Sequence, residues 1–163
     1  MHRAIFTLLQ LLWGLPQTLL GFLLFLYWLP RSKKRYLFHG AIVTEWTAGG
    51  GISLGVFVFV SQRASRYMRD SRELTPEESK RGVLVHEYGH CIQSLILGPL
   101  YLIAVGIPSW LWANLPALRR WRREHGHSYY SVYPEKWANR LGEWASKEPS
   151  VGQALPVRKA EIP

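Results

Sequence analysis

Two histidines stand four residues apart in the segment HEYGHCIQS, and a glutamate directly follows the first of them. On an α-helix, residues i and i+4 lie one turn apart on the same face, so His86 and His90 can offer two imidazole nitrogens to one metal ion. Glu87 is rotated from them by about 100°, which places its carboxylate beside such an ion. That is the position of a general base for a zinc-bound water. The pattern predicts a hydrolytic zinc site with Glu87 as its catalytic residue; the alternative is an ordinary packed helix.

The third metal ligand is left open by this spacing. A catalytic zinc ion commonly takes three protein ligands and keeps one position for water. The residues that could complete the set are His39, His125, His127, Glu135 and Glu143. A phenol or an imidazole near the metal could also stabilise an oxyanion, and Tyr129, Tyr130, Tyr133 and His127 are available for this, with Tyr130 and His127 as the main candidates.

The two segments HEYGH and PEKWANRLG resemble the motifs of a known family. HEYGH resembles the H-E-x-x-H helix of zincin metallopeptidases. PEKWANRLG, residues 134–142, is similar to the downstream E-x-x-A-D segment of glutamate-ligand zincins, especially the membrane-bound CAAX-type zinc proteases that process prenylated protein C-termini. The resemblance implies that Glu135 is the third zinc ligand. It also implies that Asn139, where the family has aspartate, braces a ligand histidine through its amide oxygen.

Site-2-type intramembrane proteases also carry H-E-x-x-H in an apolar helix. Their second motif is a leucine-aspartate-glycine segment. The only aspartate of this chain is Asp70, which lies in a charged connector before the histidine helix. The sequence therefore favours the glutamate-ligand family.

The helix that carries the two histidines has strong start and stop signals. Thr75 suits the N-cap, Pro76 the first helical position and Glu78 the third. Gly98-Pro99 ends the pattern, so we expect a helix over residues 75–97. A second, short helix over residues 134–144 is expected to carry Glu135.

Apolar and charged blocks alternate along the chain. Hydrophobic residues make up 48% of its 163 residues, yet the net charge is +9. Residues 4–29 carry no charge. This uncharged run is too long for the apolar core of a signal peptide, so it predicts an N-terminal transmembrane helix. The basic cluster at residues 31–35 then predicts, by the positive-inside rule, that the following chain is cytoplasmic, at the inner or plasma membrane.

Two further segments connect the predicted membrane helix to the two site helices. Residues 36–62 are rich in β-branched and aromatic residues, and the turn Gly49–Gly51 splits them, which predicts a small β-hairpin with bulges at Gly40 and Gly55. Residues 98–118 form a second apolar segment, broken by prolines. We favour a re-entrant return over a crossing, because a crossing would leave the following RRWRR cluster outside.

The sequence as a whole predicts a mainly α membrane protein with one domain over residues 1–145 and a disordered tail over residues 146–163. Its predicted function is a membrane-bound zinc metallopeptidase that acts on a peptide or protein substrate. The alternatives are a non-catalytic membrane-associated zinc-binding or interaction protein and a basic lipid-binding protein without a metal.

No nucleic-acid motif is present, and basic clusters beside apolar segments suit anionic lipids. The single cysteine, Cys91, excludes an intrachain disulfide. The substrate and the oligomeric state do not follow from the sequence.

Overall fold

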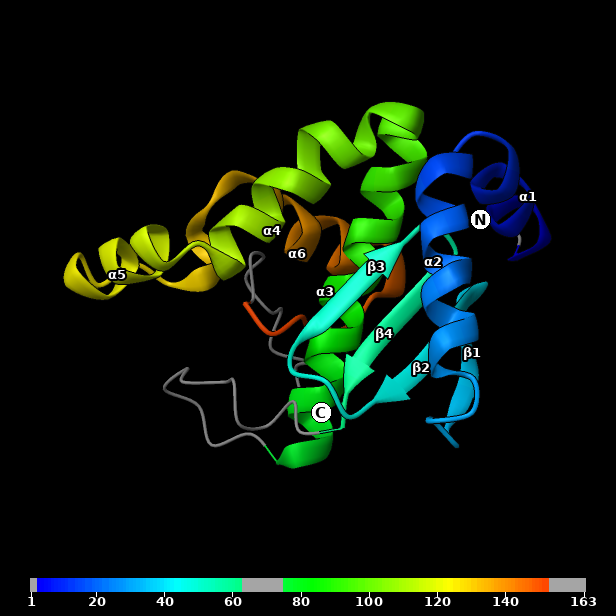
Figure 1. Cartoon of the computed structure of the whole chain (residues 1–163), viewed down its shortest axis with the longest axis horizontal. Coiled ribbons are helices and arrows are strands. Elements are labelled where there is room, and N and C mark those ends of the chain that lie inside the picture. The colour runs from blue at the N-terminus through cyan, green and yellow to red at the C-terminus, as the bar shows by residue number, and fades with distance from the viewer. Residues whose placement is uncertain (1–2, 63–74, 153–163) are drawn as a thin grey trace, which may run out of the picture.

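The computed structural model describes residues 3–62 and 75–152 and is mostly helical, with one small mixed sheet (Figure 1). The N-terminal half contains α1 (Arg3–Leu12), α2 (Leu15–Trp28), β1 (Arg35–Phe38), β2 (Ala41–Trp46), β3 (Gly51–Leu54) and β4 (Phe57–Ser61). The rest contains α3 (Pro76–Leu97), the 3-10 turn η2 (Gly98–Leu100), the π-helical turn η3 (Leu102–Gly106), α4 (Ile107–Asn114), α5 (Pro116–Glu124), the 3-10 turn η4 (Tyr129–Ser131) and α6 (Tyr133–Ser146). Helix α2 packs on one face of the sheet and α3 on the other (Figure 1).

The sheet has the order β1-β2-β4-β3, so the predicted single hairpin is wrong. The glycine-rich turn joins β2 to β3, which do not pair; β4 inserts between them, parallel to β2 and antiparallel to β3. All five residues of β4 are buried, and this explains its central place. Gly40 and Gly55, with φ of 97° and 63°, are residues of two-residue turns and not bulges.

The predicted transmembrane helix over residues 4–29 is instead two helices, α1 and α2, bent by 101°. Pro16 lacks an amide hydrogen, and a Cβ on Gly14 would lie 2.6 Å from Gln10 Oε1, so both residues favour a break here. Among the described residues, no single helix is long and apolar enough to cross a membrane, whereas this bent pair together meets the length and composition criteria.

Helix α3 confirms the predicted helix over residues 75–97. The Thr75 hydroxyl accepts a hydrogen bond from the Glu78 amide at 3.2 Å, and Glu78 Oε2 accepts one from the Thr75 amide at 2.8 Å, so the capping box is complete. The helix ends at Gly98, whose φ is 54°. The capping box and this glycine stop set the length of the helix that carries both histidines.

Helix α6 packs against α3 backbone to backbone. A Cβ on Gly89 would lie 1.8 Å from the carbonyl oxygen of Ala138, and one on Gly142 would lie 2.1 Å from that of Val85. Only glycine permits this approach at the two positions. The close contact brings the first turn of α6, with Glu135, to the middle of α3.

Two segments remain, the apolar residues 98–118 and the C-terminal segment after α6. The apolar residues 98–118 form η2, η3, α4 and the start of α5, and a proline is the first or second residue of three of these elements. The predicted disorder is wrong for residues 146–152, because Ser146 is the last residue of α6, the Val151 amide donates to the Gly82 carbonyl at 3.2 Å and the Ser150 hydroxyl to Glu143 Oε1 at 2.6 Å. Residues 153–163 lie outside the described residues.

Candidate metal centre

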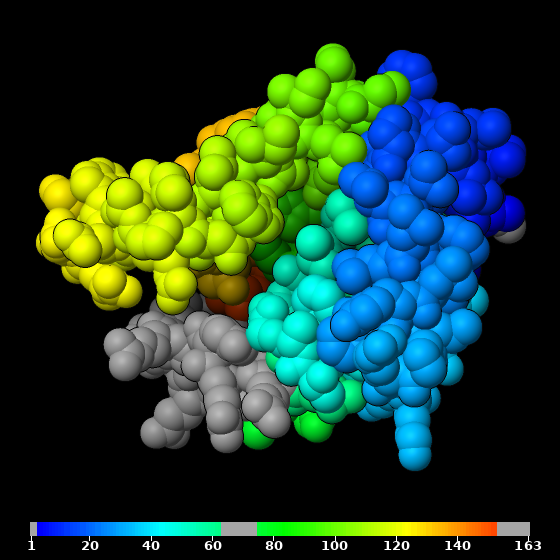
Figure 2. All heavy atoms as spheres, viewed as in Figure 1, coloured from blue at the N-terminus to red at the C-terminus, as the bar shows by residue number. Residues whose placement is uncertain are grey.

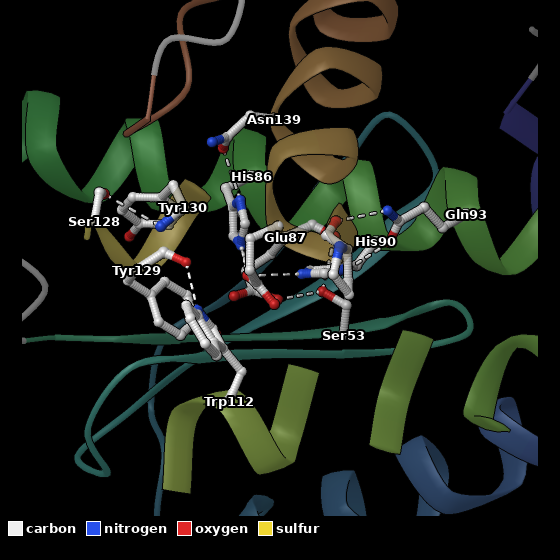
Figure 3. A network of polar contacts seen from close by, with 12 residues as sticks. Ser53, His86, Glu87, His90, Gln93, Trp112, Ser128, Tyr129, Tyr130 and Asn139 are labelled. Atoms are coloured by element: carbon white, nitrogen blue, oxygen red, sulfur yellow. Dashed lines mark hydrogen bonds and ion pairs between the residues drawn. The ribbon is translucent and has the colours of Figure 1, made fainter. Parts of the chain in front are cut away.

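His86 and His90 on α3 and Glu135 on α6 converge in the protein interior. Figure 3 shows the two imidazoles close to each other, with Glu87 beside them. Glu135 Oε2 lies 3.1 Å from His86 Nε2 and 3.5 Å from His90 Nε2. The candidate ligand atoms of the three residues all lie within 4.8 Å of one another. All three side chains are buried, and that of Glu135 is fully so. The structure therefore assembles a buried His-His-Glu group that could hold a metal ion.

Both histidines are held in the tautomer that binds metals through Nε2. The Nδ1 atom of His86 lies 2.7 Å from Asn139 Oδ1, and that of His90 lies 2.7 Å from Gln93 Oε1. The Gln93 amide is oriented by its own Nε2, which donates to the Pro134 carbonyl at 2.8 Å. Because amide oxygens only accept, each Nδ1 carries a proton, and each Nε2 is left to bind either a second proton or a metal ion.

A cation is the natural partner of this group. When both imidazoles are neutral, two nitrogen lone pairs face a buried carboxylate, and neither oxygen of Glu135 then accepts a hydrogen bond within the described residues. Buried electron-pair donors without a proton or a cation between them repel one another and lack the compensation that buried polar groups need. A proton or a metal ion removes this conflict.

The pKa values of Glu135 and His90 are shifted in opposite directions by their mutual interaction. Burial by itself raises the pKa of Glu135, but interactions with His86 and His90 outweigh it and hold this pKa well below its usual value. Burial by itself lowers the pKa of His90, but the neighbouring Glu135 outweighs it and raises this pKa to about 9. The carboxylate is therefore ionised, and a metal ion competes with a proton for the imidazole of His90.

Glu87 lies beside the cluster, and its carboxylate is directed toward β3 (Figure 3). The hydroxyl of Ser53 donates a hydrogen bond to Glu87 Oε2 at 2.6 Å. A Cβ on Gly51 would lie 2.2 Å from Glu87 Oε1, so glycine leaves the room that this carboxylate occupies. Strand β3 thus positions a buried acid next to the His-His-Glu group without making it part of that group.

A cleft of about 560 Å³ opens over Glu87 and His90. It is lined by β3 on one side and by η3 and α4 on the other, and Figure 2 shows this side of the molecule hollowed between β3 and α4. Its lining is largely apolar, with Leu20, Leu102, Ile107 and Trp110 among its residues. The cleft is large enough for a peptide fragment to reach the carboxylate of Glu87 and the imidazole of His90.

Tyr129, and not Tyr130, lines this cleft together with Glu87. Burial, and next the charge of Glu135, raise the pKa of Tyr129 well above its ordinary value, so its phenol stays a neutral hydrogen-bond donor. The Tyr130 ring instead packs edge-on against the His86 ring, with centroids 5.1 Å apart. The aromatic run after α5 thus supplies one cleft donor and one support for a ligand ring.

The other candidate ligands lie away from the cluster. His125 and His127 both stack on Trp121, with ring centroids 4.7 and 4.9 Å apart, at the exposed end of α5. Residue His39 lies in the turn between β1 and β2, and Glu143 accepts hydrogen bonds from the C-terminal segment. Of the residues that the spacing left open, the structure brings only Glu135 to the histidines within its described part.

Three residues of the site were not predicted from the sequence. Gln93 lies three residues after His90 on the same helix, so its contact with that imidazole could have been read from helical spacing. Ser53 and Gly51 lie more than 30 positions before Glu87, and no local pattern connects them to it. Their role depends on how β3 is placed against α3.

Comparisons of the chain with protein-family models, with curated proteins and with solved structures find no match. The zincin resemblance therefore rests on HEYGH and PEKWANRLG, and the chemistry is argued from the geometry of this site. That geometry consists of three convergent donors, a neighbouring acid and a cleft above them.

Proposed function

We propose that this protein is a zinc-dependent metallopeptidase held at a membrane, with its site on the cytoplasmic side. The observation that carries the proposal is the convergence of two imidazole Nε2 atoms and one carboxylate beside a separate, buried Glu87. Two imidazoles and one carboxylate form a ligand set that suits zinc and that leaves a position for water and substrate. The zincin-like order of these residues along the chain supports the same assignment.

Each residue of the site has a distinct part in this proposal. Zinc, when bound by His86, His90 and Glu135, supplies Lewis-acid chemistry that makes water a nucleophile at neutral pH and polarises a carbonyl. Glu87 takes a proton from the attacking water and delivers it to the leaving amine. Ser53 holds one oxygen of Glu87 in place, and Tyr129 donates to the oxygen that becomes negative.

Strand β3 offers the substrate a binding edge. Among the described strands it pairs with β4 on one side only, and its residues line the cleft. An extended peptide that adds to this edge would gain main-chain hydrogen bonds and lie over Glu87. The edge therefore favours hydrolysis of an extended peptide segment.

Membrane association is supported by the distribution of polarity on α1 and α2. The polar side chains Gln10, Gln17 and Thr18 are buried, while Leu12 and Leu23 are 70% and 55% exposed. A helix pair in water is expected to have the reverse arrangement. Exposed leucine and aromatic side chains recur along both helices, and a lipid phase would cover them.

Metal content and hydrolysis of the purified, detergent-solubilised protein test this function. We expect one zinc per chain, lost in both His86→Ala and Glu135→Ala. Glu87→Gln should keep its zinc and lose hydrolysis of a quenched-fluorescence peptide library, whereas Glu124→Gln on the exposed surface of α5 should keep both. Turnover that persists in Glu87→Gln would refute the mechanism, and wild-type protein without zinc after zinc is supplied would refute the metal site.

A non-catalytic membrane-associated zinc-binding or interaction protein is the second candidate. It is favoured by Asn139, which holds His86 with a neutral amide where the resembling family has a charged aspartate. A purely structural zinc site has four protein ligands. A metal-edge X-ray absorption spectrum that shows a fourth protein ligand, in place of water, would favour this candidate over the peptidase.

A further inference from the structure

The two ends of the bent pair α1–α2 return to the same small sheet. A Cβ on Gly40 would lie 3.1 Å from the carbonyl oxygen of Arg3, the first residue of α1. One turn further along α1, the Thr7 hydroxyl donates a hydrogen bond to the Gly40 carbonyl at 3.3 Å. At the end of α2, the chain passes through Ser32, whose hydroxyl donates to the Glu45 carbonyl at 2.5 Å, and enters β1. The beginning and the end of the pair are therefore joined through β1 and its turn.

The distance between these two ends is too short for a membrane crossing. Strand β1 has four residues, so it spans about 13 Å. Helices of 10 and 14 residues are about 15 and 21 Å long, and with a bend of 101° their end-to-end reach is about 23 Å. The hydrocarbon core of a bilayer is about 30 Å thick. Two points this close cannot lie in water on opposite sides of it.

The bent pair is one part of a larger apolar surface. On η2, η3 and α4, the side chains of Leu100, Ile103, Ile107 and Trp110 are 63%, 68%, 54% and 61% exposed. The joint of the bent pair contacts η2, because a Cβ on Gly98 would lie 2.3 Å from the Trp13 ring. The two parts are therefore adjacent, and in Figure 1 the turn between α1 and α2 lies beside the segment that joins α3 to α4.

A polar network inside the molecule holds these parts together. Gln17 Nε2 donates to the Gly98 carbonyl at 3.0 Å and to the Ser94 hydroxyl at 2.8 Å, and Gln10 Nε2 donates to the Cys91 carbonyl at 2.8 Å. These bonds link α1 and α2 to the C-terminal end of α3. Since straightening the pair into one helix would break them, they stabilise the bend.

Basic residues follow the apolar surface where the chain leaves it. After α2 come the exposed Arg31, Lys33, Lys34 and Arg35. After α4, helix α5 carries the exposed Arg119, Arg120 and Arg123. Basic clusters that begin directly where apolar segments end are suited to the anionic headgroups of one membrane surface.

We infer that the protein enters a single leaflet of an anionic bilayer through α1–α2 and η2–α4, with both basic clusters at the headgroups of that leaflet. The start of α1 and the residues after α2 then lie on the same side of the membrane, in contrast to the crossing predicted from charge. The inference rests on the proposed membrane association and specifies on which side of the membrane each end of the bent pair lies. Leu20, Ile107 and Trp110 line the cleft and belong to the apolar surface, so the mouth of the cleft faces the lipid.

Thiol labelling in sealed membrane vesicles tests this topology. Arg3→Cys and Lys33→Cys place one thiol at each end of the bent pair, and the wild type is the blank because Cys91 is fully buried. A membrane-impermeant maleimide is applied to inside-out and to right-side-out vesicles. We expect both variants to be labelled in the same vesicle type and neither in the other. Labelling of the two variants in opposite vesicle types would overturn the inference.

Insertion is measured separately with a matched pair of variants. Leu12→Cys lies on the apolar surface, and Lys136→Cys lies on the exposed side of α6. A fluorophore at residue 12 should be quenched several-fold by bilayers of brominated lipid with phosphatidylglycerol, and one at residue 136 should not be. No quenching at residue 12, with a dimer in solution, would overturn the inference and assign the surface to a second copy. Labelling and quenching can also be measured in the Glu87→Gln background, because they need neither zinc nor hydrolysis. A failure of the topology is therefore distinguishable from a failure of the proposed peptidase function.

Discussion

Replacement of Asn139 tests whether the contact behind His86 controls the metal site. Asn139 is buried, and its Oδ1 accepts the proton of His86 Nδ1 at 2.7 Å. In Asn139→Ala this acceptor is lost, and a buried N–H without a partner costs about 1–3 kcal/mol. Because the imidazole also loses its orientation, zinc affinity should fall about 10- to 100-fold. That change corresponds to about 1.4–2.7 kcal/mol of binding free energy.

Asn139→Asp should act in the opposite direction. Aspartate has nearly the same shape and places a negative charge against the Nδ1–H of His86, which makes its Nε2 a stronger ligand. We expect tighter zinc binding than in the wild type and, if the protein is a peptidase, a higher kcat. The pair of variants thus separates the loss of an acceptor from a change in its charge.

The assay is competition for zinc with a chromophoric chelator at constant pH, together with the free energy of unfolding of each metal-free variant. Asn114→Ala is the matched control, because Asn114 lines the cleft but donates to the Trp110 carbonyl on its own helix. An Asn139→Ala protein that folds as stably as the wild type and binds zinc with unchanged affinity would refute the reasoning.

Three further predictions concern the base, the helix start and the metal. Ser53→Ala removes the hydrogen bond to Glu87 Oε2 and should lower kcat about 10-fold with zinc content and KM unchanged, as measured by steady-state kinetics. Thr75→Ala should destabilise the protein by about 1 kcal/mol in chemical denaturation, because the N-cap of α3 is lost. Hydrogen bonds from Thr75 lower the pKa of Glu78, so this capping contribution should be present above the ordinary pKa of 4.5 and be lost as the pH falls through the lowered value; denaturation at two pH values measures it. Removal of zinc by a chelator should lower Tm, and zinc at 100 times its Kd should restore about 2.7 kcal/mol; a Tm insensitive to zinc would contradict the site.

Local patterns were sufficient for the two helices that carry the site. The histidine spacing and the caps at Thr75 and Gly98 act within one or two helical turns, so short-range geometry determines them. For the same reason the helix over residues 133–146 was predicted nearly to its ends. The identity of Glu135 as a candidate ligand came from a resemblance, since nothing in its own neighbourhood distinguishes it from a solvated glutamate near a helix start.

Contacts between distant segments decided the rest. Glu135 reaches the histidines because glycines at 89 and 142 let two helices, far apart in sequence, meet backbone to backbone. The buried strand β4 lies at the centre of the sheet, so β2 and β3 do not form the expected hairpin. Gln10 and Gln17 donate hydrogen bonds to Cys91 on α3 and to Gly98, and these bonds stabilise a bent helix pair where the composition indicates one straight transmembrane helix. A sequence shows which side chains are apolar and which can bind a metal or a proton. Which of them become neighbours depends on burial and packing over the whole chain, and that is decided only in the tertiary structure.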